Sequence, residues 1–398
     1  MPQFVHGADM SKSSVGDVEI TGLDAVEYGG RGRVLGRVEA DSGLAGYGTA
    51  GGNGPTVRGQ LRQMEGILLG EDPLAIERLY DTMMGQQHSH RPHVPTVSGV
   101  DIALHDLAGK ILDRPVSELL TGRFRDAVPF YVNSAPEDVL DPESCREWAD
   151  DLAADPERPS AVKLGFDEAL RSASTGRGGT TIQRERRPVT ETELNAVREA
   201  AGNVREALGG DMDFVAHLHN GLDLPSATRF AEAVAPARPL WLEDPLPIEY
   251  GESWRALKEA APCRILTGEK LEGVREFAPF VENGAVDFVQ PDLAFAGGIT
   301  GTRRIARLAD RHHVPVTAHD TSGLIQNAAT VHLGASVRNF WMTETTMIDR
   351  DWIREMGETD GLVAEDGALT VPDGPGLGVE LDPESVRSIL ADGETYWE

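Results

Sequence analysis

Eight short apolar runs between residues 128 and 346 constrain the fold of this chain more than any other feature of its sequence. They alternate with stretches of helical periodicity and read, in chain order, VPFYVNS, AVKLGF, DFVAHL, LWLEDP, RILTGE, VDFVQPD, PVTAHD and WMTETT. Parallel strands need a crossover connection, usually a helix, so the alternation predicts an α/β fold with a parallel sheet. Eight units fit a closed (β/α)8 barrel better than an open sheet, because no glycine-rich phosphate turn follows the first run.

Residues 1–127 have a different pattern from the barrel region. Alternating runs separated by Gly and Asp lie at 18–28, 33–41 and 44–50. Such runs predict an antiparallel meander. Runs with helical spacing follow at 73–84 and 97–112. The first 127 residues are therefore expected to form an α+β domain.

Two further segments complete the expected organisation. Residues 171–190 are polar, contain glycine and have no periodicity, so we interpret them as a loop inserted after the second strand. In a barrel this places the loop at the catalytic mouth, as a lid or as a plain surface insertion. Residues 347–398 are expected to fold back onto the N-terminal domain.

The charge balance excludes some classes of partner. The chain has 37 Lys and Arg against 65 Asp and Glu, a formal net charge of −28. Nucleic acids and anionic membranes bind clustered basic surface, so neither is expected as a partner. Only five of the basic residues are lysines, and an acid-rich, lysine-poor surface is typical of proteins adapted to concentrated salt. Two cysteines are too few for a disulfide framework, and no apolar run is long enough for a signal peptide or a membrane span, so a soluble cytoplasmic protein is expected.

Polar side chains recur at the ends of the last six apolar runs. They are His217, Glu243, Glu269, Asp292, His319 and Glu344, separated by 26, 26, 23, 27 and 25 residues. A single acid after a strand is often only a helix N-cap. The carboxyl ends of barrel strands, however, meet at one mouth, where barrel enzymes hold their active sites. The repetition therefore predicts an active site.

The residue types at this mouth indicate a particular chemistry. Glu243 and Glu269 come from adjacent strands and would repel each other unless a cation neutralises them, so we predict a hard divalent metal, Mg²⁺ first. Asp292 can fix the tautomer of His319 and raise its basicity, which is typical of a general base. Lys163 lies in the run AVKLG and is expected to reach the mouth and bind a substrate carboxylate, because its charge needs a partner.

Two histidine pairs are treated differently. His217 and His219 form an HxH pattern at the end of the third strand, so their side chains point the same way, His217 toward the metal and His219 toward the substrate. An alternative is a zinc-dependent amidohydrolase-type barrel that activates water. Those barrels carry HxH on the first strand, which disfavours this alternative. The HSH at 88–90, near His93, is interpreted as a loop without an active-site role.

Longer motifs carry a resemblance that covers nearly the whole chain. They are SGVDIALHDLAGKILDRPVSELLTG, LWLEDPLP, ILTGEK, VQPDLAFAGGITGTRRIARLA, VTAHD and VPDGPGLGVELD. Together they resemble the enolase superfamily, in its mandelate racemase/muconate lactonizing enzyme branch, and most of all its sugar-acid dehydratases. The resemblance implies a modified (β/α)8 TIM barrel, an α+β capping domain built from both ends of the chain, and Mg²⁺ bound by acids on strands three, four and five.

The resemblance assigns the metal ligands and the base. It makes Glu243 and Glu269 ligands and His319 with Asp292 the catalytic dyad. His217 stands where the family has aspartate. An imidazole is neutral and softer, so the site loses one negative charge and its preference shifts from Mg²⁺ toward Mn²⁺, zinc or another divalent metal.

The remaining roles also follow from the resemblance. Glu344 would hydrogen-bond the developing enediolate, Lys163 would be the cation of the second strand, and His219 would be the general acid for the leaving hydroxyl. Gly165 stands where racemases and lactonizing enzymes have a second lysine, which favours dehydration over racemisation.

The sequence therefore predicts an aldonate dehydratase that removes the C2 proton and eliminates the C3 hydroxyl, giving a 2-keto-3-deoxy acid. His217 motivates an alternative, a catalytically impaired or non-catalytic relative. A racemase or epimerase is a lesser alternative. We also expect a homo-oligomer.

Overall fold

Eight parallel strands form the closed barrel that the alternating runs predicted. The structure is a computed structural model that describes residues 18–29, 32–85, 92–166, 170, 188–345 and 355–397. The barrel strands are β4 (Ala127–Asn133), β5 (Ala161–Gly165), β6 (Asp213–His217), β7 (Leu242–Glu243), β8 (Ile265–Thr267), β9 (Phe288–Val289), β10 (Val316–Ala318) and β11 (Phe340–Glu344). Each pairs with the next, and β11 closes the ring on β4 through Thr343 opposite Phe130 and Glu344 opposite Tyr131.

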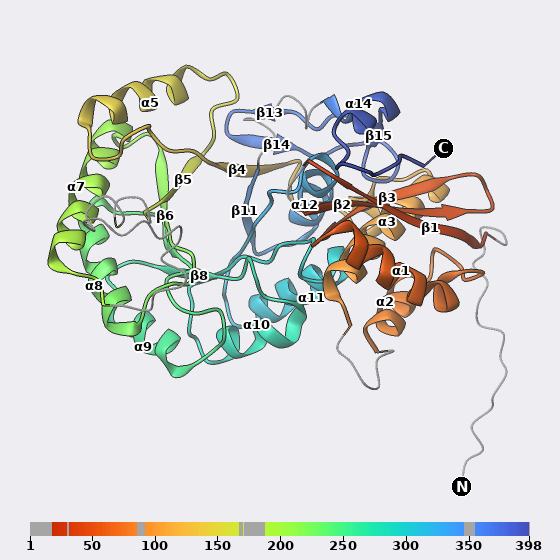
Figure 1. The fold of residues 1–398 in the computed structure, drawn as a ribbon, viewed down its shortest axis with the longest axis horizontal. Coiled ribbons are helices and arrows are strands. Elements are labelled where there is room, and N and C mark those ends of the chain that lie inside the picture. The colour runs from red at the N-terminus through yellow and green to blue at the C-terminus, as the bar shows by residue number, and fades with distance from the viewer. Residues whose placement is uncertain are drawn as a thin grey trace, which may run out of the picture.

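Helices connect the strands and surround the ring (Figure 1). They are α5 (Pro142–Ala154), α7 (Glu191–Leu208), α8 (Leu224–Val234) with the short 3₁₀ turn Ala235–Ala237, α9 (Glu252–Ala260), α10 (Gly273–Glu282), α11 (Gly298–Arg311) and α12 (Leu324–Ser336). The sequence specifies where several of them begin. At α7, for example, Thr190 and Glu193 form a capping box that satisfies backbone N–H groups of the first turn.

The N-terminal region is the predicted α+β unit. Strands β1 (Ile20–Tyr28), β2 (Arg33–Ala40) and β3 (Ala45–Gly51) form the antiparallel meander, followed by α1 (Gly54–Leu68), α2 (Ile76–Gly85), α3 (Val94–Leu112) and α4 (Val116–Leu119). The sequence interpretation missed α1, whose three glycines weaken its helical signal and whose first turn is capped by Asn53. Helix α3 lies directly on β3, because a Cβ at Gly48 would meet the Gly99 carbonyl oxygen at 2.0 Å.

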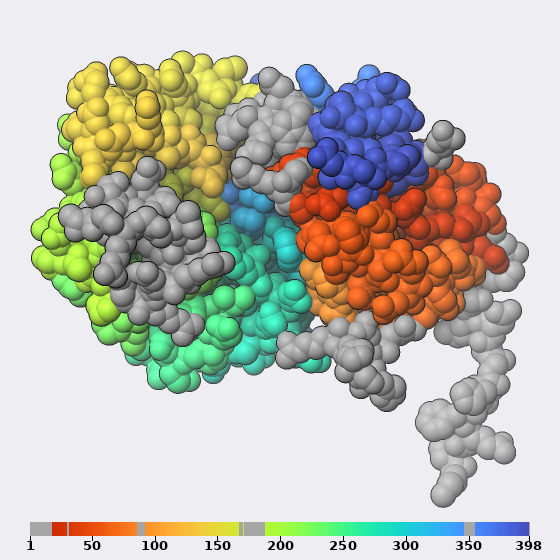
Figure 2. Space-filling model, viewed as in Figure 1, coloured from red at the N-terminus to blue at the C-terminus, as the bar shows by residue number. Residues whose placement is uncertain are grey.

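The C-terminal segment returns to this cap. It contains β12 (Gly357–Thr359), β13 (Ala364–Glu365), β14 (Ala368–Thr370), β15 (Val379–Leu381) and α14 (Pro383–Ser388). Strand β14 pairs with β4 of the barrel, whereas Leu390 forms a bridge with Tyr28 of β1 and Glu394 pairs with Arg58 at 2.6 Å. In Figure 2 the dark blue C-terminal residues lie against the red and orange N-terminal ones. The cap is thus built from both ends of the chain.

Two predicted segments lie outside the described residues: the HSH at 88–90 and all but the last three residues of the 171–190 insertion. In the part of the chain that the structure describes, none of the helices has the length and apolarity needed to cross a membrane.

Candidate active site at the barrel mouth

The strand ends converge as the sequence pattern predicted. Strands β6, β7 and β11 end at His217, Glu243 and Glu344, and Lys163 is the middle residue of β5. Three more polar residues, Glu269, Asp292 and His319, follow their strands within three residues. All are buried except Glu269 and His319, which are partly open to solvent. Contacts of 2.6–3.9 Å link these seven side chains into one cluster.

Lys163 forms the centre of this cluster. Its Nζ lies 3.1 Å from Glu243 Oε1 and 2.7 Å from Glu344 Oε2. Burial alone would lower the pKa of Lys163, but the two carboxylates outweigh burial and raise it. Lys163 therefore keeps its positive charge at neutral pH.

A second layer of polar side chains supports these acids from inside the barrel. Glu243 Oε2 accepts hydrogen bonds from Trp241 Nε1 at 3.2 Å and from Gln290 Nε2 at 3.4 Å. Gln290 also donates to the hydroxyl of Tyr131, which lies 3.5 Å from Glu344 Oε2. Both oxygens of Glu243 are thus held by protein donors.

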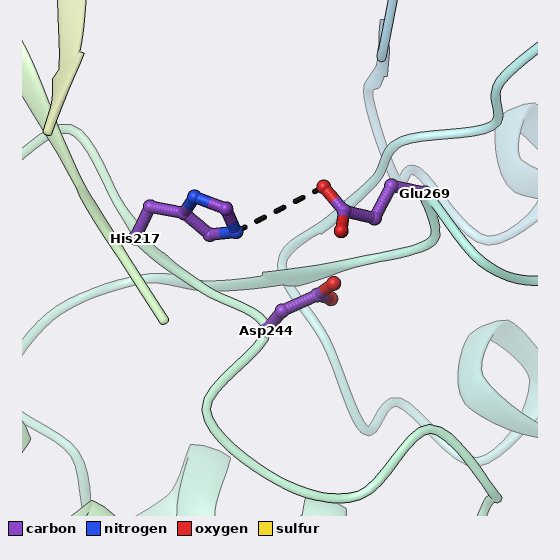
Figure 3. A group of neighbouring side chains, drawn as sticks. All are labelled: His217, Asp244 and Glu269. Carbon is purple, nitrogen blue, oxygen red and sulfur yellow. Dashed lines mark ion pairs between the residues drawn. The ribbon is translucent and has the colours of Figure 1, made fainter. Parts of the chain in front are cut away.

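Three side chains with metal-binding atoms face one another at one side of the mouth, and two of them belong to the cluster described above. His217, Asp244 and Glu269 each offer one donor atom, and these atoms lie within 4.8 Å of one another. Figure 3 shows the three side chains converging on one point, with the ion pair between His217 and Glu269 marked. Glu243 Oε1 is 3.7 Å from His217 Nε2, so it lies at the edge of the group. That Glu243 is itself a ligand remains a prediction.

Sequence reasoning missed Asp244 and Lys270 as parts of this site. Asp244 has a positive φ of 50°, which is uncommon for a residue other than glycine and is often found at functional sites. Its carboxylate accepts from Thr267 Oγ1 at 2.6 Å, and Lys270 Nζ lies 3.5 Å away. Lys270 also contacts Glu269, and its Nζ donates a hydrogen bond to Asn220 Oδ1 at 2.8 Å. Asp244 lies in the motif LWLEDP and Lys270 in ILTGEK, but neither residue repeats at the spacing of the strand ends.

The donor set fits a divalent cation. Burial, followed by the charge of Lys163, lowers the pKa of His217 well below its usual value, so its imidazole is neutral and can act as a ligand. Its Nε2 is buried and has no hydrogen-bond partner among the described residues. Burial and the neighbouring Glu269 raise the pKa of Asp244 to about 7. The shift reflects repulsion between crowded acids, and a bound cation would relieve this repulsion. Two carboxylates and one imidazole suit Mg²⁺, Mn²⁺ or a softer transition metal.

His319 and Asp292 form the predicted pair. His319 Nδ1 lies 2.6 Å from Asp292 Oδ2, and Gln326 Nε2 donates to Asp292 Oδ1 at 2.8 Å. His319 Nε2 points across the mouth to Glu269 Oε2 at 3.5 Å and Glu344 Oε2 at 3.9 Å. Burial would lower the pKa of His319, but Glu344, Glu269 and Asp292 raise it to about 10.

The HxH pair also lies at the mouth. The rings of His217 and His219 are 4.2 Å apart between centroids, at an interplanar angle of 47°. His219 is only partly buried and lies on the loop after β6, whereas His319 follows β10 across the ring. Two histidines therefore approach the mouth from different sides.

Comparison with known proteins agrees with this architecture. The family described as mandelate racemase/muconate lactonizing enzyme, N-terminal domain, matches residues 30–121, and the family described as enolase C-terminal domain-like matches residues 179–385. A solved mandelate racemase/muconate lactonizing enzyme-like protein from Rubrobacter xylanophilus superposes with a TM-score of 0.87 at 28% identity, over 96% of this chain and 100% of that one.

Curated relatives align over most of their length. A D-xylonate dehydratase from Haloferax volcanii is 32% identical over 395 residues, which are 97% of this chain and 92% of that protein. A D-gluconate dehydratase from Thermoproteus tenax is 30% identical over 90% of this chain and 70% of that protein. A D-galactonate dehydratase from Cronobacter sakazakii is 28% identical over 88% and 89%. The chain belongs to the mandelate racemase/muconate lactonizing enzyme branch of the enolase superfamily.

Proposed function

We propose that the protein is a metal-dependent dehydratase of a sugar acid. The observation that carries the proposal is the position of His319, which is paired with Asp292 at 2.6 Å and directs its other ring nitrogen at the acids of the metal-donor group. This places a base next to the point where a substrate carboxylate would bind. The relatives named above, which are sugar-acid dehydratases, support the same reaction class.

The side chains at the mouth divide the binding work. Lys163 holds a permanent positive charge that attracts the substrate carboxylate. Burial raises the pKa of Glu344, whose Oε2 lies 3.9 Å from His319 Nε2, and this carboxyl group would hydrogen-bond an enediolate oxygen. Such preorganised donors in a buried site supply a large part of catalysis in reactions of this type.

His217, Asp244 and Glu269, with Glu243 as the predicted further ligand, would hold the metal ion. A bound divalent ion would polarise the substrate carboxylate, acidify the C2 proton and offset the negative charge that Glu269 places beside His319.

The two histidines would then handle the two protons. His319 Nε2 takes the proton from C2, while Asp292 fixes the ring through Nδ1. As the C3–O bond breaks, His219 gives a proton to the departing hydroxide, which leaves as water. The enol that remains becomes a 2-keto-3-deoxy acid.

A panel of aldonates tests this function. D-xylonate, D-gluconate and D-galactonate should be assayed with Mg²⁺ and with Mn²⁺, at low and at high salt, and the keto product should be detected with semicarbazide. We expect a metal-dependent keto acid from at least one of them. Absence of a keto acid from every C5 and C6 aldonate would contradict the proposal.

A second candidate is a relative that retains the fold and has lost activity. The specific observation in its favour is His217, which supplies a neutral ligand where the resemblance implies an acid. Calorimetric titration with Mg²⁺ and Mn²⁺ separates the two candidates, because a saturable site that Glu269→Gln removes would favour the enzyme.

A further inference from the structure

The loop that carries His319 is held by side chains from the barrel and from the cap. Residues 319–323 connect β10 to α12, and α12 lies where the barrel meets the cap (Figure 1). Three carbonyl groups of this loop accept hydrogen bonds from side chains. Gln326 Nε2 donates to the carbonyl of His319 at 3.3 Å, Arg33 Nε donates to that of Thr321 at 2.8 Å, and the Tyr28 hydroxyl donates to that of Ser322.

Two of these three donors belong to the cap. Tyr28 is the last residue of β1 and Arg33 the first of β2, so they stand on either side of one hairpin turn. Both are buried, and they lie 294 and 288 residues away in sequence from the carbonyls that they contact. The C-terminal segment fixes the same hairpin, because Gly29 N donates to the Ile389 carbonyl at 2.8 Å.

Buried polar groups flank these contacts. Asp320, the residue after His319, is completely buried, and burial raises the pKa of its carboxyl well above the usual value. Burial also raises the pKa of Tyr28 to about 12, so its hydroxyl keeps the proton that it donates to the Ser322 carbonyl.

We propose that Tyr28 and Arg33 of the cap are positioning residues for the base His319. They act through the 320–322 backbone and do not touch the ring. The barrel alone holds His319 through Asp292 and Gln326, and the cap fixes the loop on the other side of the same residue. Docking of the cap therefore sets the direction in which the imidazole faces the mouth. The catalytic part of this inference depends on the proposed function, whereas the mechanical part does not.

Hydrogen exchange measured by mass spectrometry tests the mechanical part. The variants are Tyr28→Phe, which removes one hydroxyl, and Arg33→Gln. Loss of one hydrogen bond should speed exchange of the amides in residues 319–323 about threefold to tenfold, with little change in the barrel strands. The matched control is Arg304→Gln, which breaks another contact between cap and barrel, that of α11 with Asp81 and Glu77 of α2. This control should leave exchange in 319–323 unchanged.

Kinetics tests the catalytic part on whichever aldonate the wild type dehydrates. Misplacement of the base should lower kcat about tenfold to a hundredfold with KM within a factor of two, because substrate binding uses other side chains. Exchange of the C2 proton and dehydration should fall by the same factor. Unchanged amide hydrogen exchange in residues 319–323 of both variants would overturn the inference. A rise in KM with kcat preserved would overturn it as well. An inactive wild type would instead overturn the proposed function and leave the exchange result standing.

Discussion

Nδ1 of His319 lies 2.6 Å from Oδ2 of Asp292, and this contact leaves Nε2 as the ring atom that faces the mouth. The opposite oxygen of Asp292 is also fixed, by Gln326 Nε2 and by the backbone N–H of Ala294. The carboxylate therefore has one orientation, and so does the imidazole.

The first prediction concerns the division of labour between His319 and His219. We expect His319→Asn to abolish both exchange of the C2 proton with solvent deuterium and dehydration. His219→Asn should keep part of the exchange and lose most of the elimination. General acids and bases contribute about 10² to 10⁴ in rate, so both losses are measurable by NMR and by keto-acid assay. Equal loss of exchange in both variants would mean that His219 is not the acid.

The second prediction concerns His217, the candidate metal ligand that stands where the resemblance implies an aspartate. His217→Asp adds a negative charge to the donor group and should tighten Mg²⁺ binding about tenfold or more, while weakening preference for softer metals. Calorimetric titration with Mg²⁺ and Zn²⁺ measures both changes. His219→Asp adds the same charge at a residue outside the donor group and serves as the control. Unchanged affinity for both ions in His217→Asp would contradict a metal role for residue 217.

The third prediction concerns the acids of the donor group. Glu269→Gln should weaken metal binding about a hundredfold, and Glu282→Gln, on the exposed face of α10, should have no effect. The same titration of Asp244→Asn and of Glu243→Gln measures how much each of these adjacent acids contributes to metal affinity. We expect both to weaken binding. Full affinity in Glu243→Gln would assign Glu243 solely to Lys163, its neighbour at 3.1 Å.

The fourth prediction concerns stability in mild acid. His332 lies inside α12, accepts a hydrogen bond from Ser117 N at 3.2 Å, and burial lowers its pKa from 6.5 to about 4. Between these two values the unfolded chain binds a proton that the folded chain does not, so the free energy of unfolding falls as the pH falls. The loss amounts to about 3 kcal/mol across the whole interval.

Chemical denaturation of wild type and His332→Gln at several pH values measures this contribution. The stability advantage of the wild type should shrink from pH 7 toward pH 4. His312→Gln, at an exposed histidine, should show a constant difference. A constant difference for His332→Gln as well would contradict the prediction.

The fifth prediction concerns salt. A net charge of −28 makes the folded chain repel itself, and the Debye length shortens from about 10 Å to about 3 Å between 0.1 M and 1 M salt. The thermal midpoint should therefore rise steeply with KCl over this range. Sucrose does not screen charge and should not reproduce the steepness. A midpoint independent of KCl would contradict salt adaptation.

The sequence predicted those parts of the site that follow a period. His217, Glu243, Glu269, Asp292, His319 and Glu344 each end one unit, and a closed barrel brings such positions together without any knowledge of loop geometry. Lys163 was also predictable, because a lysine in an apolar run needs partners.

The remaining parts depend on conformations that no local pattern encodes. Asp244 faces the donor group only because its backbone is left-handed, and an interpretation of LWLEDP as a regular strand points it away. Lys270 follows β8 by three residues, where strand periodicity no longer applies. Tyr28 and Arg33 donate hydrogen bonds to the loop of His319, which lies almost 300 residues away in sequence. Only the folded chain therefore identifies them.

The cap that is built from both chain ends has a consequence for synthesis of the protein. Chains begin to fold from the N-terminus while still on the ribosome. The β1–β2 hairpin is translated well before its partners Ile389, Leu390 and Ala391. A nascent chain can therefore form barrel units before its cap is complete. Completion of the cap, and with it the final placement of the loop that carries His319, is expected only after residues 389–391 have been translated.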